Sequence, residues 1–200
     1  MGDKHISSQF DAELNSISTH VLEMGGLVES QLHQAVYALT HMSLETAEQV
    51  IETEQRINQM EVNIDHEIIS TIGRRQPTAR DLRFLMAISR TTQNLERAGD
   101  EVARIARMVK SIIQNGSPRN LPSSELRMAA DLAAALLRKT LDSFARLDTT
   151  MAVAIIKGDD AIDQEYNGFL RKLITYMMED PRTISASLDL LFLAKAIERI

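Results

Sequence analysis

The acidic side chains of one helical segment are the residues of this sequence best suited to chemistry. Glu54, Asn58, Glu61 and Asp65 follow one another at intervals of four, three and four residues, so they lie along one face of a helix. That stripe borders an apolar line on the same helix, which places its oxygen atoms beside a packed surface. Oxygen ligands of this kind suit magnesium, manganese, calcium or iron.

A second acidic pair flanks the apolar seam of a later helix. Glu96 and Asp100 are four residues apart, and Gly99 lies between them on the seam. A glycine there lets two backbones approach closely, which would bring the two acidic stripes together. Like charges four residues apart repel each other unless a cation or an arginine offsets them. Part of the set recurs in the second half of the chain, at Asp159, Asp163 and Glu198.

Two interpretations of these carboxylates are open from the residues alone. In the first, they are solvated or paired with arginines, and Asp100–Arg104 and Arg97–Glu101 are available ion pairs. In the second, they hold a metal ion mainly through oxygen, because the chain has no cysteine and its five histidines lack the spacing of metal ligands. The Glu-x-x-His motif of ferritin-like di-iron bundles is absent from the sequence.

Arginines form a regular line on the helix that carries Glu96, opposite its apolar seam. Arg83, Arg90, Arg97 and Arg104 recur every seven residues, and further arginines lie close by in the sequence. This line is either a solvated outer face or a docking surface for an acidic partner or phosphate. The docking interpretation uses Arg80, Arg83, Arg90 and Arg97.

No pattern typical of an enzyme accompanies these residues. The sequence has no Ser/His/Asp arrangement, no phosphate-cradling glycine loop and no dinucleotide fingerprint, so we expect that the protein is not an enzyme. A net charge of −6 and a pI of about 5.4 argue against wrapping along nucleic acid. Neither a signal peptide nor an apolar run long enough to span a membrane is visible, which predicts a cytoplasmic location.

The elements that must position these residues are long helices. Eight glycines, four prolines, ten methionines and no tryptophan favour an all-α core. Apolar residues at steps of three and four predict six helices with turns near residues 41–43, 73–77, 115–125, 146–148 and 179–185, and a break near Gly158 in the fifth.

The second half of the chain repeats the plan of the first. An offset of 102–105 residues superposes residues 54–58 on 159–163, and 95–98 on 197–200. Matched prolines, Pro77 and Pro181, follow the middle helix of each half. We therefore predict an all-α fold of two tandem three-helix bundles related by an internal repeat, residues 1–116 and 121–200. The last helix has no stop signal at Ile200, so we expect the second repeat to be truncated there.

Four segments together resemble the PhoU family of bacterial phosphate-transport accessory and regulatory proteins. These are residues 75–83 (RQPTARDLR), 96–100 (ERAGD), 176–183 (YMMEDPRT) and 197–200 (IERI). The resemblance covers the whole chain and implies two tandem three-helix bundles, a spectrin-like helical fold that is often dimeric.

The resemblance also implies a metal motif, Glu/Asp-x-x-x-Asp, which carries iron, manganese, zinc or magnesium in some members. Glu61–Asp65 and Glu96–Asp100 match it. In the second repeat Glu198 matches, whereas Tyr166 and Leu170 stand at the places of Glu61 and Asp65. The remaining ligands expected for that repeat are Asp159 and Asp163.

As a function, the resemblance implies a negative regulator of the phosphate-starvation response and of phosphate uptake. Such a protein couples the ATPase subunit of a phosphate ABC transporter to a sensor histidine kinase through protein contacts, and reaches the membrane only through these partners. A homodimer is expected, and nucleic acid is not expected as a partner. The alternative, suggested by the carboxylates, is a metal-dependent helical hydrolase acting on a phosphorylated substrate.

Overall fold

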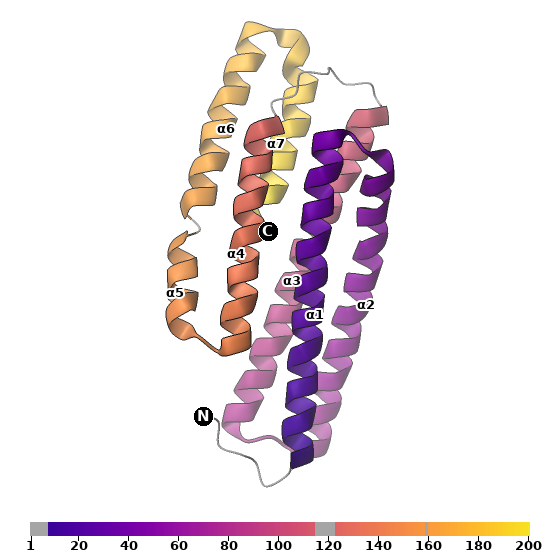
Figure 1. Cartoon of the computed structure of the whole chain (residues 1–200), viewed down its shortest axis with the longest axis vertical. Coiled ribbons are helices and arrows are strands. Elements are labelled where there is room, and N and C mark those ends of the chain that lie inside the picture. Colours follow the sequence, from indigo (N-terminus) through magenta and orange to yellow (C-terminus); the bar gives the residue numbers. More distant parts are fainter. Residues whose placement is uncertain (1–7, 115–122, 159) are drawn as a thin grey trace.

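The chain folds as an all-α protein, which confirms the fold class predicted from its periodicity. The computed structural model describes residues 8–114, 123–158 and 160–200, and these contain helices but no strand. Figure 1 shows the helices as two neighbouring groups. Their bounds are α1 Ser8–His41, α2 Leu44–Arg75, α3 Ala79–Gln114, α4 Ser123–Arg146, α5 Thr149–Gly158, α6 Asp160–Glu179, the 3-10 turn η1 Pro181–Thr183 and α7 Ile184–Glu198.

Local signals place the ends of these helices where the sequence predicts them. Ser43 caps α2, because its hydroxyl accepts a hydrogen bond from the Thr46 amide at 3.3 Å. At the other end of α2, Gln76 is left-handed (φ 45°) and its amide donates to the Ile72 carbonyl, after which Pro77 ends the helix. The described helix α5 ends at Gly158, where the sequence predicts a break, and α6 begins at Asp160.

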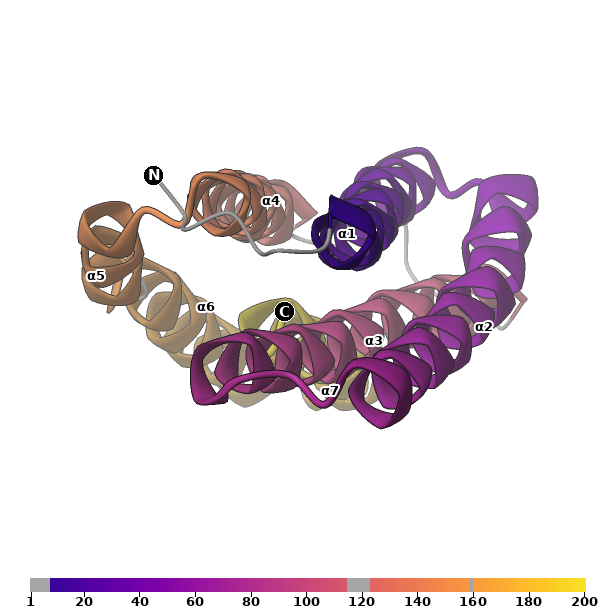
Figure 2. The same cartoon turned by 90° about the horizontal axis from the view of Figure 1, so that it is seen from below.

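The helices form two layers. Helices α2, α3, α7 and α6 lie side by side in that order, and α1 and α4 pack on them as a second layer (Figure 2). Helices α3 and α7 run in opposite directions along the molecule (Figure 1). The two repeats are therefore related by an approximate two-fold rotation about an axis that passes through both layers.

Both repeats contribute to one of the two hydrophobic cores. This core contains Leu32 and Val109 from the first repeat together with Leu126, Leu173 and Leu193 from the second. The other core belongs mainly to α1, α2 and α3. The predicted boundary between the repeats, residues 117–120, lies outside the described part of the chain. No described helix is long and apolar enough to cross a membrane.

Two adjacent glycines in α1 have opposite surroundings. A Cβ atom on Gly25 would overlap the Leu141 side chain of α4, whereas a Cβ on Gly26 would have no atom within 4 Å. Gly25 therefore permits the close packing of α1 on α4. Gly26 has no such packing role, and as a glycine inside a helix it lowers the stability of α1.

We expect the two corresponding alanine variants to change stability in opposite directions. Gly26→Ala raises the free energy of unfolding by about 0.5–1 kcal/mol, because alanine is the better helix former. Gly25→Ala lowers it by about 1–3 kcal/mol, because Leu141 must move to make room. Urea denaturation of the two variants measures both values, and a stabilised Gly25→Ala would contradict the packing described for α1 and α4.

Candidate metal centre

The acidic stripes of α2 and α3 lie close together where the two helices pack, and we call the line between them the α2–α3 groove. Two contacts fix the register of the helices. The Ser89 hydroxyl donates to Asp65 Oδ1 at 3.1 Å, and the Arg107 guanidinium donates to Glu54 Oε2. The carboxylates between these two contacts, on Glu61, Glu96 and Asp100, are close enough to affect one another's ionisation.

Gly99 allows this approach, as its place on the seam predicts. A Cβ atom at Gly99 would lie 3.1 Å from Cδ1 and 3.3 Å from Cγ2 of Ile57 on α2. These distances are shorter than comfortable van der Waals contacts, so any larger residue would push the helices apart. The small residue on α3 therefore sets the separation of the two acidic stripes.

Burial and mutual repulsion raise the pKa values of these carboxyl groups. Burial raises the pKa of Glu61 above its ordinary value, and the neighbouring carboxylates of Asp65 and Asp100 raise it further. Burial also raises the pKa of Glu96, with smaller contributions from Asp100 and Glu61. The pKa of Asp100 is raised by burial first and then by its hydrogen bond with the Glu54 carboxyl.

We expect the Glu61→Gln variant of the metal-free protein to be more stable than the parent at pH 7. A carboxyl whose pKa is raised on folding opposes folding once it is ionised, so its cost appears as the pH rises from about 4.5 through the raised pKa. The expected gain is about 0.5–1 kcal/mol, since each close like-charged pair costs up to about 0.5 kcal/mol. Urea denaturation between pH 4 and pH 8 measures the gain, which should vanish at the acidic end.

Glu13 provides a control of opposite sign. Its carboxylate accepts hydrogen bonds from Arg75 Nη2 at 2.7 Å and Nε at 3.1 Å, and these bonds lower its pKa. Glu13→Gln should therefore destabilise the protein at pH 7, with the loss shrinking as the pH falls below the ordinary value of 4.5. The same pH dependence for both variants would contradict the electrostatics described for the groove.

The donor atoms of the groove suit a hard metal ion. They are carboxylate oxygens, and Asn58 Oδ1 on the α2 stripe is buried without a hydrogen-bond partner. In the described residues, no three acidic or histidine side chains converge on one point as they stand. Binding would thus require carboxylates to rotate, Glu54 among them, which Arg107 now holds.

Glu54 and Arg107 also lie in the α2–α3 groove, although neither is among the predicted metal ligands. Glu54 is seven residues before Glu61, so helical spacing alone indicates its place on the stripe. No sequence pattern places Arg107 in the groove, because its contact with α2 depends on how the two helices pack.

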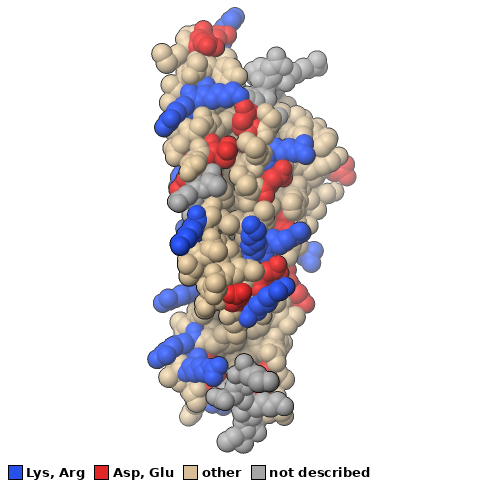
Figure 3. Space-filling view, turned by 60° about the vertical axis from the view of Figure 1, so that its left-hand side comes forward, with Lys and Arg blue, Asp and Glu red and all other residues tan. Residues whose placement is uncertain are grey.

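The α3 arginines form ion pairs that differ from the predicted ones. Arg104 Nη1 lies 3.0 Å from Glu101 Oε2 instead of pairing with Asp100, and Arg199, directly after α7, reaches Glu101 at 3.4 Å. Arg83 and Arg90 are exposed, and no described acidic side chain forms an ion pair with them. Arg80 and Arg97 are exposed as well. Elsewhere, basic and acidic side chains alternate along the face in Figure 3.

The carboxylates predicted for the second repeat have different surroundings from those of the first. Glu198 Oε2 lies 2.5 Å from the ammonium of Lys195, which is also 5.1 Å from the centre of the Tyr166 ring. Asp163 is exposed on α6, and Asp159 lies outside the described residues. A lysine therefore already supplies a positive charge to Glu198.

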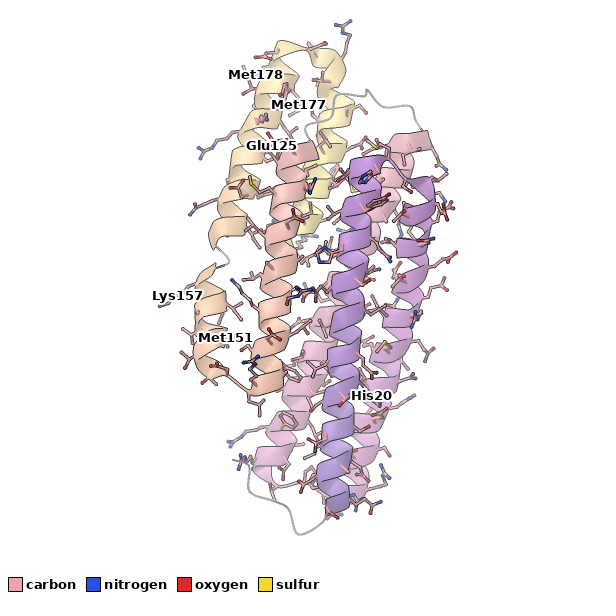
Figure 4. The ribbon with its side chains drawn as sticks, viewed as in Figure 1. His20, Glu125, Met151, Lys157, Met177 and Met178 are labelled. Atoms are coloured by element: carbon pink, nitrogen blue, oxygen red, sulfur yellow. The ribbon has the colours of Figure 1, made fainter. Side chains whose placement is uncertain are left out.

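The described histidines do not gather with acidic side chains as metal ligands, and His20 and His41 each pair with a neighbouring group. His20, labelled on α1 in Figure 4, has its Nδ1 atom 3.0 Å from Glu67 Oε2. His41 Nδ1 lies 3.1 Å from the Tyr37 carbonyl, and the two rings stack. Carboxylates are thus the donors to consider in the groove.

Comparison with known proteins places the whole chain in one family. The family described as "PhoU domain" matches residues 21–109 and 126–200. A PhoU homologue from a Burkholderia species, named a phosphate-specific transport system accessory protein, is 47% identical over 100% of this chain and 86% of its own length. The protein of that name from Escherichia coli (strain K12) is 45% identical over 99% of this chain and 81% of its own length.

Solved structures agree as well. The crystal structure of PhoU from Pseudomonas aeruginosa superposes with a TM-score of 0.90 at 41% identity, covering 95% of this chain and 90% of the other. The phosphate transport system regulatory protein PhoU from Streptococcus pneumoniae gives 0.86 at 29% identity, covering 95% and 88%. With the domain matched in both halves, this chain belongs to the PhoU family.

Proposed function

We propose that the protein is a regulatory accessory of a phosphate transport system and acts by contacts with other proteins. The observation that carries this proposal is that relatives more than 40% identical over almost the whole chain are named as accessory proteins of such a system. The exposed arginines of α3 and the absence of a nucleophile motif favour binding over catalysis.

The finer proposal is that the protein represses the phosphate-starvation response and restrains phosphate uptake when phosphate is plentiful. Its partners would be the sensor histidine kinase of that response and the ATPase subunit of the phosphate ABC transporter. The α3 line Arg83, Arg90 and Arg97 suits an acidic surface on such a partner, because these guanidinium groups are exposed.

A further part of the proposal concerns metal. Glu61, Asp65, Glu96 and Asp100 would hold iron, manganese, zinc or magnesium in the α2–α3 groove, with Glu54 and Asn58 beside them. When bound, the ion would neutralise carboxylates that burial and mutual repulsion make costly. Glu198 and Asp163, with Asp159, are the corresponding set in the second repeat.

We expect the immobilised protein to retain the kinase and the ATPase subunit, with retention that differs between high and low phosphate. The double variant Arg90→Glu/Arg97→Glu should weaken retention at least tenfold, because reversed charges repel an acidic surface. Arg171→Glu on α6 is the matched control, since Arg171 is also exposed but lies away from α3. Failure to retain either partner under both conditions would refute the regulatory proposal.

A further inference from the structure

Helix α7 is apolar on nearly all sides, but the rest of the chain covers only some of them. Between residues 188 and 197 only Asp189 and Lys195 interrupt the apolar residues. The inner positions, such as Leu190 and Leu193, are buried against neighbouring helices. A helix that is hydrophobic all round is normally buried all round. The side of α7 that this chain leaves uncovered is therefore a candidate contact surface.

The uncovered side carries a stripe of three large apolar residues. Ile184, Leu188 and Phe192 are spaced four residues apart, so they lie along one face of α7, and we call them the α7 stripe. Their side chains are 43%, 41% and 59% exposed. Helix α4 packs on one side of α7 with α3 and α6 beside it, and no other described α-helix packs on α7 (Figure 2). Large apolar side chains exposed in a group indicate a contact surface.

The first repeat has different chemistry at the equivalent places. The offset of 102 residues carries Arg90 to Phe192, and the offset of 105 carries Arg74 to Glu179. All four of these residues are exposed. The second repeat thus presents an aromatic ring and a carboxylate where the first presents guanidinium groups. Surfaces that differ in this way do not suit the same partner.

Carboxylates without a cation lie beside the α7 stripe. Asp189 is on α7 itself, next in sequence to a residue of the stripe, and Glu179 is the last residue of α6. Neither carboxylate forms an ion pair with any residue that the structure describes. These charges attract basic side chains, and they repel an anionic lipid surface. A protein partner with basic residues therefore fits this surface better than a membrane does.

Two basic residues continue the line of the stripe, and both are already paired. The Lys195 ammonium lies 2.5 Å from Glu198 Oε2, and Arg199 Nη1 lies 3.4 Å from Glu101 Oε1. The charges that remain for a partner are thus the acidic ones.

We propose that the α7 stripe binds an amphipathic helix of another protein, one whose apolar face is flanked by lysines or arginines. Such a helix buries its apolar face on the stripe and places basic side chains beside Glu179 and Asp189. The inference deepens the proposed function and rests on it only for the identity of the partner. It gives the second repeat a partner surface that differs from the arginine line of α3, so the two repeats hold two different proteins.

A synthetic peptide tests the surface without the natural partner. An amphipathic leucine–lysine peptide of about 18 residues, long enough to form a helix, should bind the parent protein in fluorescence anisotropy. Leu188→Gln/Phe192→Gln should weaken this binding about tenfold or more, because the apolar contact is lost. Val153→Gln/Ile156→Gln on α5 is the matched control, since these side chains are 55% and 74% exposed, and should leave binding unchanged. No binding to the parent, or equal binding to the stripe variant, would overturn the proposal.

Reversing the two carboxylates tests the charge of the partner. The parent should bind the leucine–lysine peptide more tightly than a leucine–glutamate peptide of the same pattern. Glu179→Lys/Asp189→Lys should reverse this preference, because the stripe is then flanked by positive charge. A preference that stays the same would contradict the basic partner.

The natural partners should separate the two repeats. Immobilised Leu188→Gln/Phe192→Gln should lose either the sensor kinase or the ATPase subunit, and the partner lost should not be the one most weakened by Arg90→Glu/Arg97→Glu. Loss of the same partner by both variants, or of neither by the stripe variant, would overturn the inference. If the parent retained neither partner, the regulatory proposal would fail, while the peptide measurements would still decide the role of the stripe.

Other occupants of the stripe would be detected with the same variants. If Leu188→Gln/Phe192→Gln left peptide binding unchanged but reduced retention on vesicles of anionic phospholipid, the stripe would belong to a membrane. If it reduced only self-association in sedimentation equilibrium, the stripe would belong to a second copy. Either result would show the proposal to be wrong.

Discussion

Asp100→Asn is expected to lower the metal affinity of the protein by about a hundredfold or more. Asp100 is adjacent to two other proposed ligands, Glu61 and Glu96, and to Glu54, so its carboxylate lies among the oxygens that would hold the ion. Loss of even an outer partner of a metal ligand costs about 10- to 100-fold in affinity, and loss of a charged ligand costs at least as much. Titration calorimetry with manganese, and elemental analysis of protein purified without a histidine tag, measure the effect.

The same substitution should make the metal-free protein more stable at pH 7. Asparagine removes a buried negative charge from among other carboxylates, and this charge opposes folding when no cation is present. A substitution that lowers the metal affinity but raises the stability of the metal-free protein indicates a binding site. Removal of a merely structural aspartate would lower both the affinity and the stability. The melting temperature with and without manganese distinguishes the two cases.

Glu48→Gln is the matched control for this experiment. Glu48 lies on the same helix, α2, and its carboxylate pairs with Lys110 at 2.8 Å, beyond the end of the groove. It should leave metal affinity unchanged. Unchanged affinity in Asp100→Asn itself would rule out the ligand set while leaving the proposed regulatory role intact.

Leu32→Ala is expected to cost about 3–4 kcal/mol of stability and to weaken both repeats equally. Leu32 lies on α1 and is fully buried in the core that contains side chains of α4, α6 and α7. Removing it leaves a cavity that both repeats line, and buried leucine-to-alanine changes in such cores cost several kcal/mol. If one core joins the repeats, they should unfold in a single transition.

Because the chain has no tryptophan, the fluorescence of a single introduced tryptophan reports on one known position. Phe84→Trp reports on the first repeat and Tyr166→Trp on the second, and both native side chains are partly buried. Leu32→Ala should shift the urea midpoint equally for both reporters, while Ile156→Ala, at a position that is 74% exposed, should shift neither. A shift confined to the first reporter would show that the repeats unfold independently.

The helices of this protein are largely determined by local signals, which is why the sequence predicts them well. Ser43 and Pro77 mark the ends of α2, and α5 ends at Gly158, as expected. Helical periodicity likewise places Glu54, Asn58, Glu61 and Asp65 on one stripe without any knowledge of the fold. A pattern within one helix depends only on residues that are close in the sequence.

Helical periodicity and the internal repeat therefore establish the all-α class, the two repeats and the position of each acidic stripe. The packing of the helices, in contrast, selects which cation pairs with which carboxylate: Arg107 pairs with Glu54, Arg104 with Glu101 and Lys195 with Glu198. The same packing brings Leu32 and Leu193 into one core. Most of these relations join residues about 50 to 160 positions apart, or depend on which of several nearby partners a flexible side chain selects, and helical periodicity carries no information about either.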